Sequence, residues 1–89
     1  MAAKFKSVIA ELNKYKSNWR TRAEVNSTIS SLANKLQQMK HTRDKELKLC
    51  KTEEAKRNVH KSHDNSIKFY DFLLYKIKFE YDEIVSKLP

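Results

Sequence analysis

Seven apolar residues near the C-terminus repeat at alternating steps of three and four, and this spacing constrains the fold more than any other feature. This main stripe consists of Ile67, Tyr70, Leu74, Ile77, Tyr81, Ile84 and Leu88. Such a repeat places every member on one side of an α-helix, as in a coiled coil. Because an apolar helix side is stable in water only when another surface covers it, the main stripe requires packing partners.

A smaller set of aromatic residues lies on another side of the same predicted helix, and we call it the aromatic stripe. Its members Phe72, Tyr75 and Phe79 are well removed from the main stripe when the helix is drawn at about 100° per residue. The solvent side is marked by Lys68, Asp71, Lys78 and Asp82. If other helices cover only the main stripe, the aromatic stripe stays exposed and predicts a surface for a protein partner.

The alternative is that this helix is the centre of a bundle and buries both stripes in the core. Phe69, three residues before Phe72, is included as a fourth candidate contact residue. Either arrangement gives these aromatic side chains a role in packing.

The chain contains no glycine, and its one proline stands at position 89. These two residue types break helices and form tight turns, so their scarcity excludes a hairpin-rich β fold and predicts an all-α protein. Only 39% of the 89 residues are apolar, which leaves a single domain of residues 1–89 with little core. We therefore expect an antiparallel helical bundle or coiled-coil hairpin of about three helices, with one long central helix, that forms an oligomer.

The first helix is expected near residues 4–19. Its apolar positions, Phe5, Val8, Leu12, Tyr15 and Trp19, again step by three and four. Thr21 and Glu24 then form a capping-box pattern, in which each side chain can accept a hydrogen bond from the other residue's backbone, and this predicts a helix start at Arg22. A helix that continues through Trp19 is also compatible with the sequence.

The second helix is expected over residues 22–61 and the third over residues 64–88, because turn-forming residues cluster at 62–66. A helix of 40 residues would be about 60 Å long, longer than its neighbours could cover. Part of it should project into solvent or onto a partner. One uninterrupted helix through 62–66, in an elongated dimer, remains the alternative.

The chain has a net charge of +8, and its densest run of basic residues lies on its least apolar stretch. Its basic residues are Lys40, Arg43, Lys45, Lys48, Lys51, Lys56, Arg57 and Lys61. A helix that presents these cations could bind nucleic acid along the phosphate backbone, which is our second functional hypothesis. Acidic residues interrupt the stretch and no aromatic residue is available to stack on bases, so a solvated, ion-paired face is the simpler interpretation.

Charge also indicates how the first and last helices pack. The first helix ends in basic residues, among them Lys16 and Arg20, whereas the last carries Glu80, Asp82 and Glu83. Parallel packing of these helices, as in an up-down-up bundle, would bring the opposite charges together.

The sequence carries no glycine-rich phosphate loop, nucleophile elbow or HExxH motif, so neither an enzyme nor a cofactor is expected. Cys50, His60 and His63, with His41 nearby, match no familiar zinc spacing, and no metal is predicted. A single cysteine and the lack of a secretory signal predict a location in the cytoplasm or nucleus. No apolar run approaches the roughly 20 residues that span a bilayer.

These observations predict a non-enzymatic module for protein–protein interaction or assembly. It would act as a homo-oligomer or as one subunit of a larger helical complex.

Overall fold

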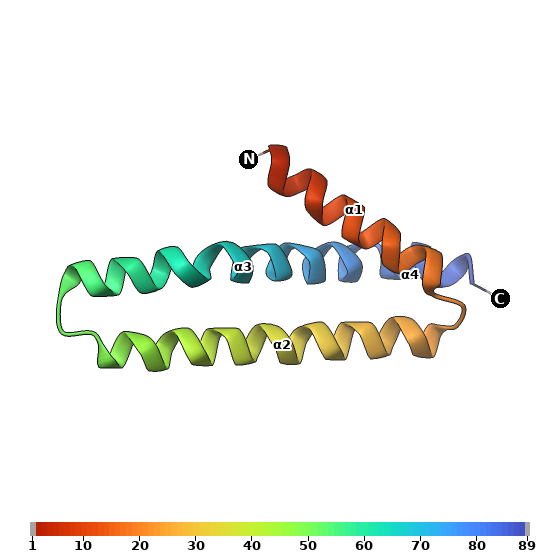
Figure 1. Cartoon of the computed structure of the whole chain (residues 1–89). Helices are drawn as coiled ribbons and strands as arrows, with labels where there is room; N and C mark the ends of the chain where they lie inside the picture. Colours follow the sequence, from red (N-terminus) through yellow and green to blue (C-terminus); the bar gives the residue numbers. More distant parts are fainter. Residues whose placement is uncertain (1, 89) are drawn as a thin grey trace.

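The computed structural model describes the backbone of residues 2–88 and the side chains of residues 6–88. Residues 2–88 form four helices: α1 (Ala2–Asn18), α2 (Arg22–Leu49), α3 (Glu53–Phe79) and α4 (Tyr81–Ser86) (Figure 1). No strand occurs among residues 2–88. The predicted all-α class is therefore confirmed. The predicted side-chain position of Phe5 lies outside the described side chains.

Helices α2 and α3 form a long antiparallel hairpin, and α1 crosses the C-terminal half of α3 in roughly the same direction as α3 runs (Figure 1). Helix α3 is thus the central element, in contact with α1 and α2, and α4 extends it after a short break at Glu80. The molecule measures 54 × 27 × 17 Å. The predicted bundle is correct, but its central helix is α3 and not the helix that begins at Arg22.

The start of α2 agrees with the sequence-based prediction. The Thr21 hydroxyl accepts a hydrogen bond from the Glu24 backbone N–H at 3.3 Å, and Glu24 Oε1 accepts one from the Thr21 N–H at 3.0 Å. This capping box satisfies two backbone donors that a helix N-terminus otherwise leaves open. Because α1 ends at Asn18, the alternative of one helix through Trp19 is wrong.

The turn between the long helices is a correction, because it lies at residues 50–52 and not at 62–66. The Thr52 side chain caps α3 by accepting from the Ala55 N–H at 3.1 Å, and Glu53 and Glu54 place negative charge at the positive end of that helix. This break makes α2 and α3 28 and 27 residues long, so the main stripe runs alongside α2. The polar residues at 62–66 are accommodated inside α3, and neither a helix over 22–61 nor one uninterrupted helix forms.

The apolar core occupies only one half of the hairpin. Eleven described apolar residues are buried: Val8, Leu12, Trp19, Val25, Leu32, Leu36, Ile67, Leu73, Leu74, Ile77 and Ile84. Four of them belong to the main stripe, and its other three members are partly buried against the same cluster. Residues 37–66 contribute no buried side chain. The region 40–61 therefore projects beyond the core, as expected, but as a two-helix arm.

Polar atoms of the tyrosines lie at the rim of this core. The Tyr81 hydroxyl donates a hydrogen bond to Asn26 Oδ1 at 2.7 Å, and the Lys35 ammonium lies 4.7 Å from the centre of the Tyr70 ring. Hydrogen bonding to Tyr70 raises the pKa of Lys35. A tyrosine buries its ring while its hydroxyl finds a polar partner, which explains why these members of the main stripe are only partly buried.

An ion pair joins α1 to the end of α3, as the charge distribution predicted. Lys16 Nζ lies 3.0 Å from Glu80 Oε1, and Lys76 Nζ lies 3.5 Å from Glu80 Oε2. The hydrogen bond from Lys16 holds the pKa of Glu80 below its usual range, against the opposing effect of partial burial. This stabilisation is complete at pH values above the unfolded-state pKa and is lost as the pH falls through the lower folded-state pKa.

We expect Glu80→Gln to lower the free energy of unfolding by about 1 kcal/mol at pH 7, and the difference from the unmodified chain to be smaller at pH 3, because the stabilisation is lost as the pH falls toward and through the lowered folded-state pKa of Glu80. Urea denaturation at the two pH values measures both quantities. Glu83→Gln is the matched control, because Glu83 is 67% exposed and pairs only with Lys87 in its own helix segment. A difference as large at pH 3 as at pH 7 would contradict the assignment to this ion pair.

Candidate partner-binding face

The aromatic stripe lies on the outer side of α3. Phe72, Tyr75 and Phe79 are 53%, 64% and 75% exposed, respectively. The rings of Tyr75 and Phe79 stack with their centres 6.1 Å apart. At about 100° per residue the aromatic stripe is roughly opposite the main stripe, which faces α2. The alternative in which this helix buries both stripes is therefore wrong: the main stripe faces the core and the aromatic stripe is exposed.

Helix α1 leaves the aromatic stripe exposed because it packs on the side of α3 between the two stripes. Leu73 marks that side and is fully buried. Glu80, seven residues later and so on the same side, pairs with Lys16 of α1. Leu73 was not among the residues predicted for the core, although its position beside Leu74 widens the main stripe.

The exposed face is not flat. Val8 of α1 and four residues of α3 line a hollow of about 150 Å³ at the edge of the aromatic stripe: Phe72, Tyr75, Lys76 and Phe79. Ile9, next to Val8 on α1, is 39% exposed. The combination of projecting rings and an adjacent apolar hollow gives this face a shape that an opposing side chain can fill.

Phe69, the fourth candidate, lies elsewhere. Its ring is half-buried, meets the Tyr70 ring edge to face with centres 5.4 Å apart, and packs against the core. It shares a shallow hollow with Ser7 of α1. The structure thus brings three of the four candidate residues together on one exposed face, and it places Phe69 on the side that α1 approaches.

A second hollow, of about 350 Å³, lies where the end of α1 meets α3 and α4. The sequence analysis did not identify it. Its lining is mixed in charge: Lys16, Ser17, Trp19, Arg20, Glu80, Glu83, Ile84, Lys87 and Leu88. The carboxylates of Glu80 and Glu83 pair with Lys16 and Lys87 of this chain.

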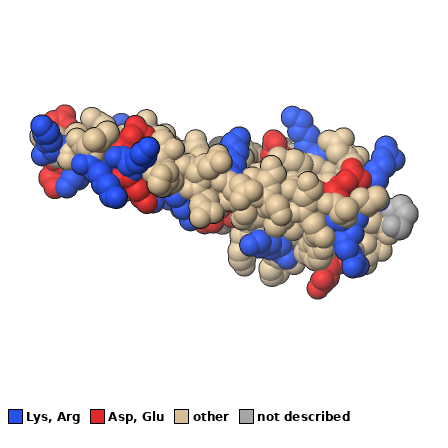
Figure 2. All heavy atoms as spheres, turned by 90° about the horizontal axis from the view of Figure 1, so that it is seen from below, with Lys and Arg blue, Asp and Glu red and all other residues tan. Residues whose placement is uncertain are grey.

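The predicted basic residues are distributed over both helices of the arm. Four lie on α2, Lys51 lies in the turn and three lie on α3, so the expectation of one basic helix is wrong. Figure 2 shows acidic and basic side chains interleaved at this end of the molecule. Lys56 Nζ, for example, lies 3.7 Å from Glu53 Oε1. The arm is a mixed-charge surface and not a continuous row of cations.

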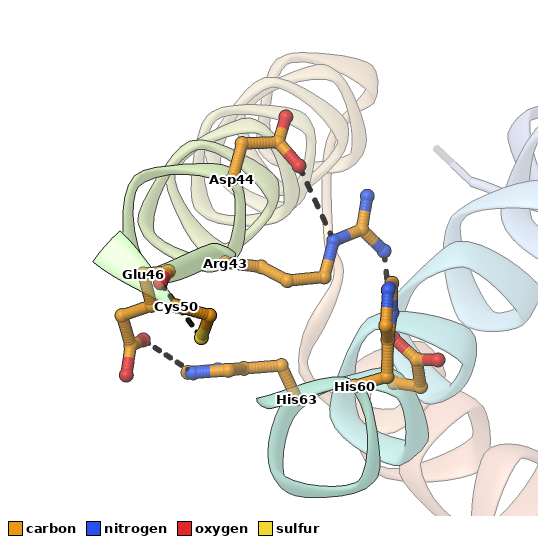
Figure 3. Close-up of polar contacts among 7 residues, drawn as sticks. Arg43, Asp44, Glu46, Cys50, His60 and His63 are labelled. Atoms are coloured by element: carbon orange, nitrogen blue, oxygen red, sulfur yellow. Dashed lines mark hydrogen bonds and ion pairs between the residues drawn. The ribbon is translucent and has the colours of Figure 1, made fainter. Parts of the chain in front are cut away.

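Polar contacts connect α2 and α3 near the base of the arm (Figure 3). Arg43 of α2 reaches Asp64 of α3, with Nη1 3.5 Å from Oδ1, and Glu46 contacts Nε2 of His63. His60 Nδ1 lies 3.5 Å from Asp64 Oδ1. Within residues 6–88 no three His, Cys, Asp or Glu side chains gather closely enough to hold a metal ion.

Comparisons of the chain with protein-family models, curated proteins and solved structures gave no match. Among the helices described here, none is both long and apolar enough to cross a membrane.

Proposed function

We propose that this chain is a non-enzymatic module for protein–protein association and that the aromatic stripe is its contact surface. The partner is a second copy or another subunit of a helical complex, in the cytoplasm or nucleus. One observation carries the proposal: three aromatic side chains are more than half exposed on one side of one helix. Isolated exposed apolar residues are ordinary on protein surfaces, whereas contiguous patches mark interaction sites.

The size of the patch supports this proposal. A large aromatic side chain offers about 200 Å² of surface, so the exposed fractions of Phe72, Tyr75 and Phe79 amount to roughly 400 Å². That value lies within the range of the largest apolar patch on a typical monomer, about 300–600 Å², where such patches are often functional.

The fixed position of α3 also supports the aromatic stripe as a contact surface. Helix α3 is held by α2 along the main stripe and by α1 at Leu73 and Glu80, so the exposed rings project from a fixed backbone. A fixed surface loses little conformational entropy on binding. The arm offers weaker support for nucleic-acid binding, because acidic residues alternate with its cations and Arg43 is engaged by Asp44 and Asp64.

Photocrosslinking in cells that make this protein tests the proposal directly. We expect a benzophenone amino acid in place of Tyr75 to give about tenfold more protein adduct than the same group in place of Leu49. A residue in a contact surface typically contributes about 1–2 kcal/mol to the binding free energy, and about 1.4 kcal/mol corresponds to a tenfold difference in the population of the complex. Leu49 is the matched control because it is an apolar residue of the arm that is 80% exposed.

Two further variants sharpen this experiment. Phe79→Ala should reduce the adduct formed at position 75, whereas Lys48→Glu with Arg57→Glu on the arm should leave it unchanged. Exposed side chains contribute little to folding, so we expect the free energy of unfolding of Phe79→Ala to stay within about 0.5 kcal/mol of the unmodified value. Equal adduct yields at positions 75 and 49 would show that the aromatic stripe is not a contact surface.

A further inference from the structure

We propose that the aromatic stripe binds a second copy of this chain, packed antiparallel about a two-fold axis that passes near Tyr75. This inference depends on the proposed function of the stripe and specifies its partner. It follows from the charges at the two ends of the stripe, from the surface area of the stripe, and from the ion pairs already present around it.

The regular spacing of the aromatic stripe extends to one charged residue at each end. Lys68, Phe72, Tyr75, Phe79 and Asp82 step by four, three, four and three residues, and all five side chains are exposed. This is the spacing of a coiled-coil contact stripe, with its centre at Tyr75 and one charged residue seven positions to either side. At 1.5 Å per residue the stripe is about 21 Å long.

The helix stays continuous enough to keep Asp82 in this row. Although α3 ends at Phe79 and Glu80 caps it, α4 continues the main stripe, because Ile84 is buried and Tyr81 packs against the same core. Asp82, seven residues after Tyr75, is therefore exposed on the side away from the core, as the three rings are. The stripe therefore runs from a positive end at Lys68 to a negative end at Asp82.

A stripe with opposite charges at its ends is complementary to itself in one orientation only. In an antiparallel pair centred on Tyr75, Lys68 of each copy faces Asp82 of the other, because a two-fold interface repeats every contact. In a parallel pair, Lys68 would face Lys68 and Asp82 would face Asp82. Like charges directly opposed across an interface are unfavourable, so the stripe selects the antiparallel orientation.

The flanking charges agree with this orientation. Asp71 and Lys78 lie on the same edge of the stripe, and antiparallel packing brings Asp71 of one copy beside Lys78 of the other. A parallel pair would instead match these two residues with Lys76 and Glu83. Those residues already pair within one copy, Lys76 with Glu80 at 3.5 Å and Glu83 with Lys87 at 3.3 Å.

The surface area predicts a dimer of modest affinity. The three rings supply roughly 400 Å² per copy, about half of the 800 Å² that each partner contributes to a standard interface. The hollow that Val8 lines together with Phe72, Tyr75 and Phe79 extends the apolar contact, and it lies where a ring of the second copy would approach. We therefore expect a dimer that dissociates when the protein is diluted.

Light scattering over a concentration series tests the pairing by exchange of charges. We expect the mass to rise from 10.6 kDa toward twice that value between roughly 1 µM and 1 mM, as for a dissociation constant in the micromolar range. Lys68→Glu alone and Asp82→Lys alone should each weaken dimerisation at least tenfold. In the homodimer of either variant, like charges face each other at both ends of the stripe. Lys45→Glu on the arm is the control for a change in net charge and should have no such effect.

An equimolar mixture of the two single variants is the decisive sample. In the mixed dimer the introduced glutamate faces the introduced lysine, and the native Asp82 faces the native Lys68, so dimerisation should return to the level of the unmodified chain. Failure of the mixture to dimerise would overturn the antiparallel arrangement. A dimer that neither single variant weakens would place the contact on another face.

A chain that stays monomeric to about 1 mM would exclude the second copy as the partner, since standard-size interfaces associate well below that concentration. The crosslinking experiment separates this result from a failure of the proposed function. An adduct at position 75 whose added mass is not that of one further copy would support the aromatic stripe as a contact surface and show that its partner is another protein. The absence of adducts would contradict both the proposed function and the dimer.

Discussion

Replacing Trp19 with alanine is expected to lower the free energy of unfolding by about 3–5 kcal/mol, the usual cost of removing a buried aromatic side chain. Trp19 is only 7% exposed, stacks on Tyr15 with ring centres 5.9 Å apart, and donates its indole N–H to Thr28 Oγ1 at 3.0 Å. It lies in the short link between α1 and α2, so its loss opens the core and weakens the attachment of α1. Urea denaturation followed by circular dichroism measures the change.

Two companion variants separate packing from hydrogen bonding. Trp19→Phe keeps an aromatic ring in the core but lacks the donor, and Thr28→Val removes the acceptor, so we expect each to cost less than Trp19→Ala, with Thr28→Val at about 1 kcal/mol. A cost below about 1 kcal/mol for Trp19→Ala would contradict the packing of α1 against the hairpin. Protein concentrations near 1 µM are required, because association would otherwise add to the measured stability.

Leu73→Ala is expected to cost about 3 kcal/mol, within the range of 2–5 kcal/mol for leucine-to-alanine changes in a core. Leu73 is fully buried on the side of α3 that α1 covers, between the two stripes. The substitution leaves a cavity at the position where the third helix joins the hairpin. Because the total stability of small domains is about 5–15 kcal/mol, a loss of this size brings the chain close to unfolding.

Leu49→Ala is the matched control for this prediction, since the chemical change is the same and only the environment differs. Leu49 is 80% exposed at the end of α2, and we expect its replacement to change the free energy of unfolding by less than about 0.5 kcal/mol. Equal effects of the two substitutions would mean that α1 does not cover Leu73. The same urea titration provides both values.

These two predictions concern only the half of the hairpin that has an apolar core. The arm is held by contacts such as Arg43 with Asp64 and Glu46 with His63. Exposed ion pairs contribute little, typically 0–1 kcal/mol. The arm therefore depends on helix propensity and capping for its order, while the candidate binding face is supported by the core.

Several features of the fold were predictable because they depend on neighbours in sequence. The three- and four-residue spacing of the main stripe identified the core side of α3, and Ile67, Leu74, Ile77 and Ile84 are all buried. The capping box at Thr21 and Glu24 gave the start of α2 correctly, because both hydrogen bonds span only three residues. The charges of the first and last helices anticipated the pair between Lys16 and Glu80.

The position of the hairpin turn was predicted wrongly because two local signals competed. The polar cluster at 62–66 resembles a turn, but so does Thr52 followed by two glutamates, and the second signal leaves α3 free to run beside α2 over its full length. His63 and Asp64 then contact Glu46 and Arg43 on the opposite helix, where their polar side chains are satisfied within a helix. Local propensity does not distinguish the two turn positions, because the packing of α3 against α2 determines which of them forms.

The sequence by itself determined that the chain is helical, and it indicated that the main stripe of α3 faces the core and that α2 begins at Arg22, because spacing and capping act within one helix turn or a few. Only the tertiary structure decided that α1 covers Leu73 and leaves Phe72, Tyr75 and Phe79 more than half exposed. That outcome depends on the angle at which α1 crosses α3, which arises from contacts between residues more than 60 positions apart, such as Lys16 and Glu80. No local pattern encodes such an angle, because it is a property of the packed surfaces of two helices.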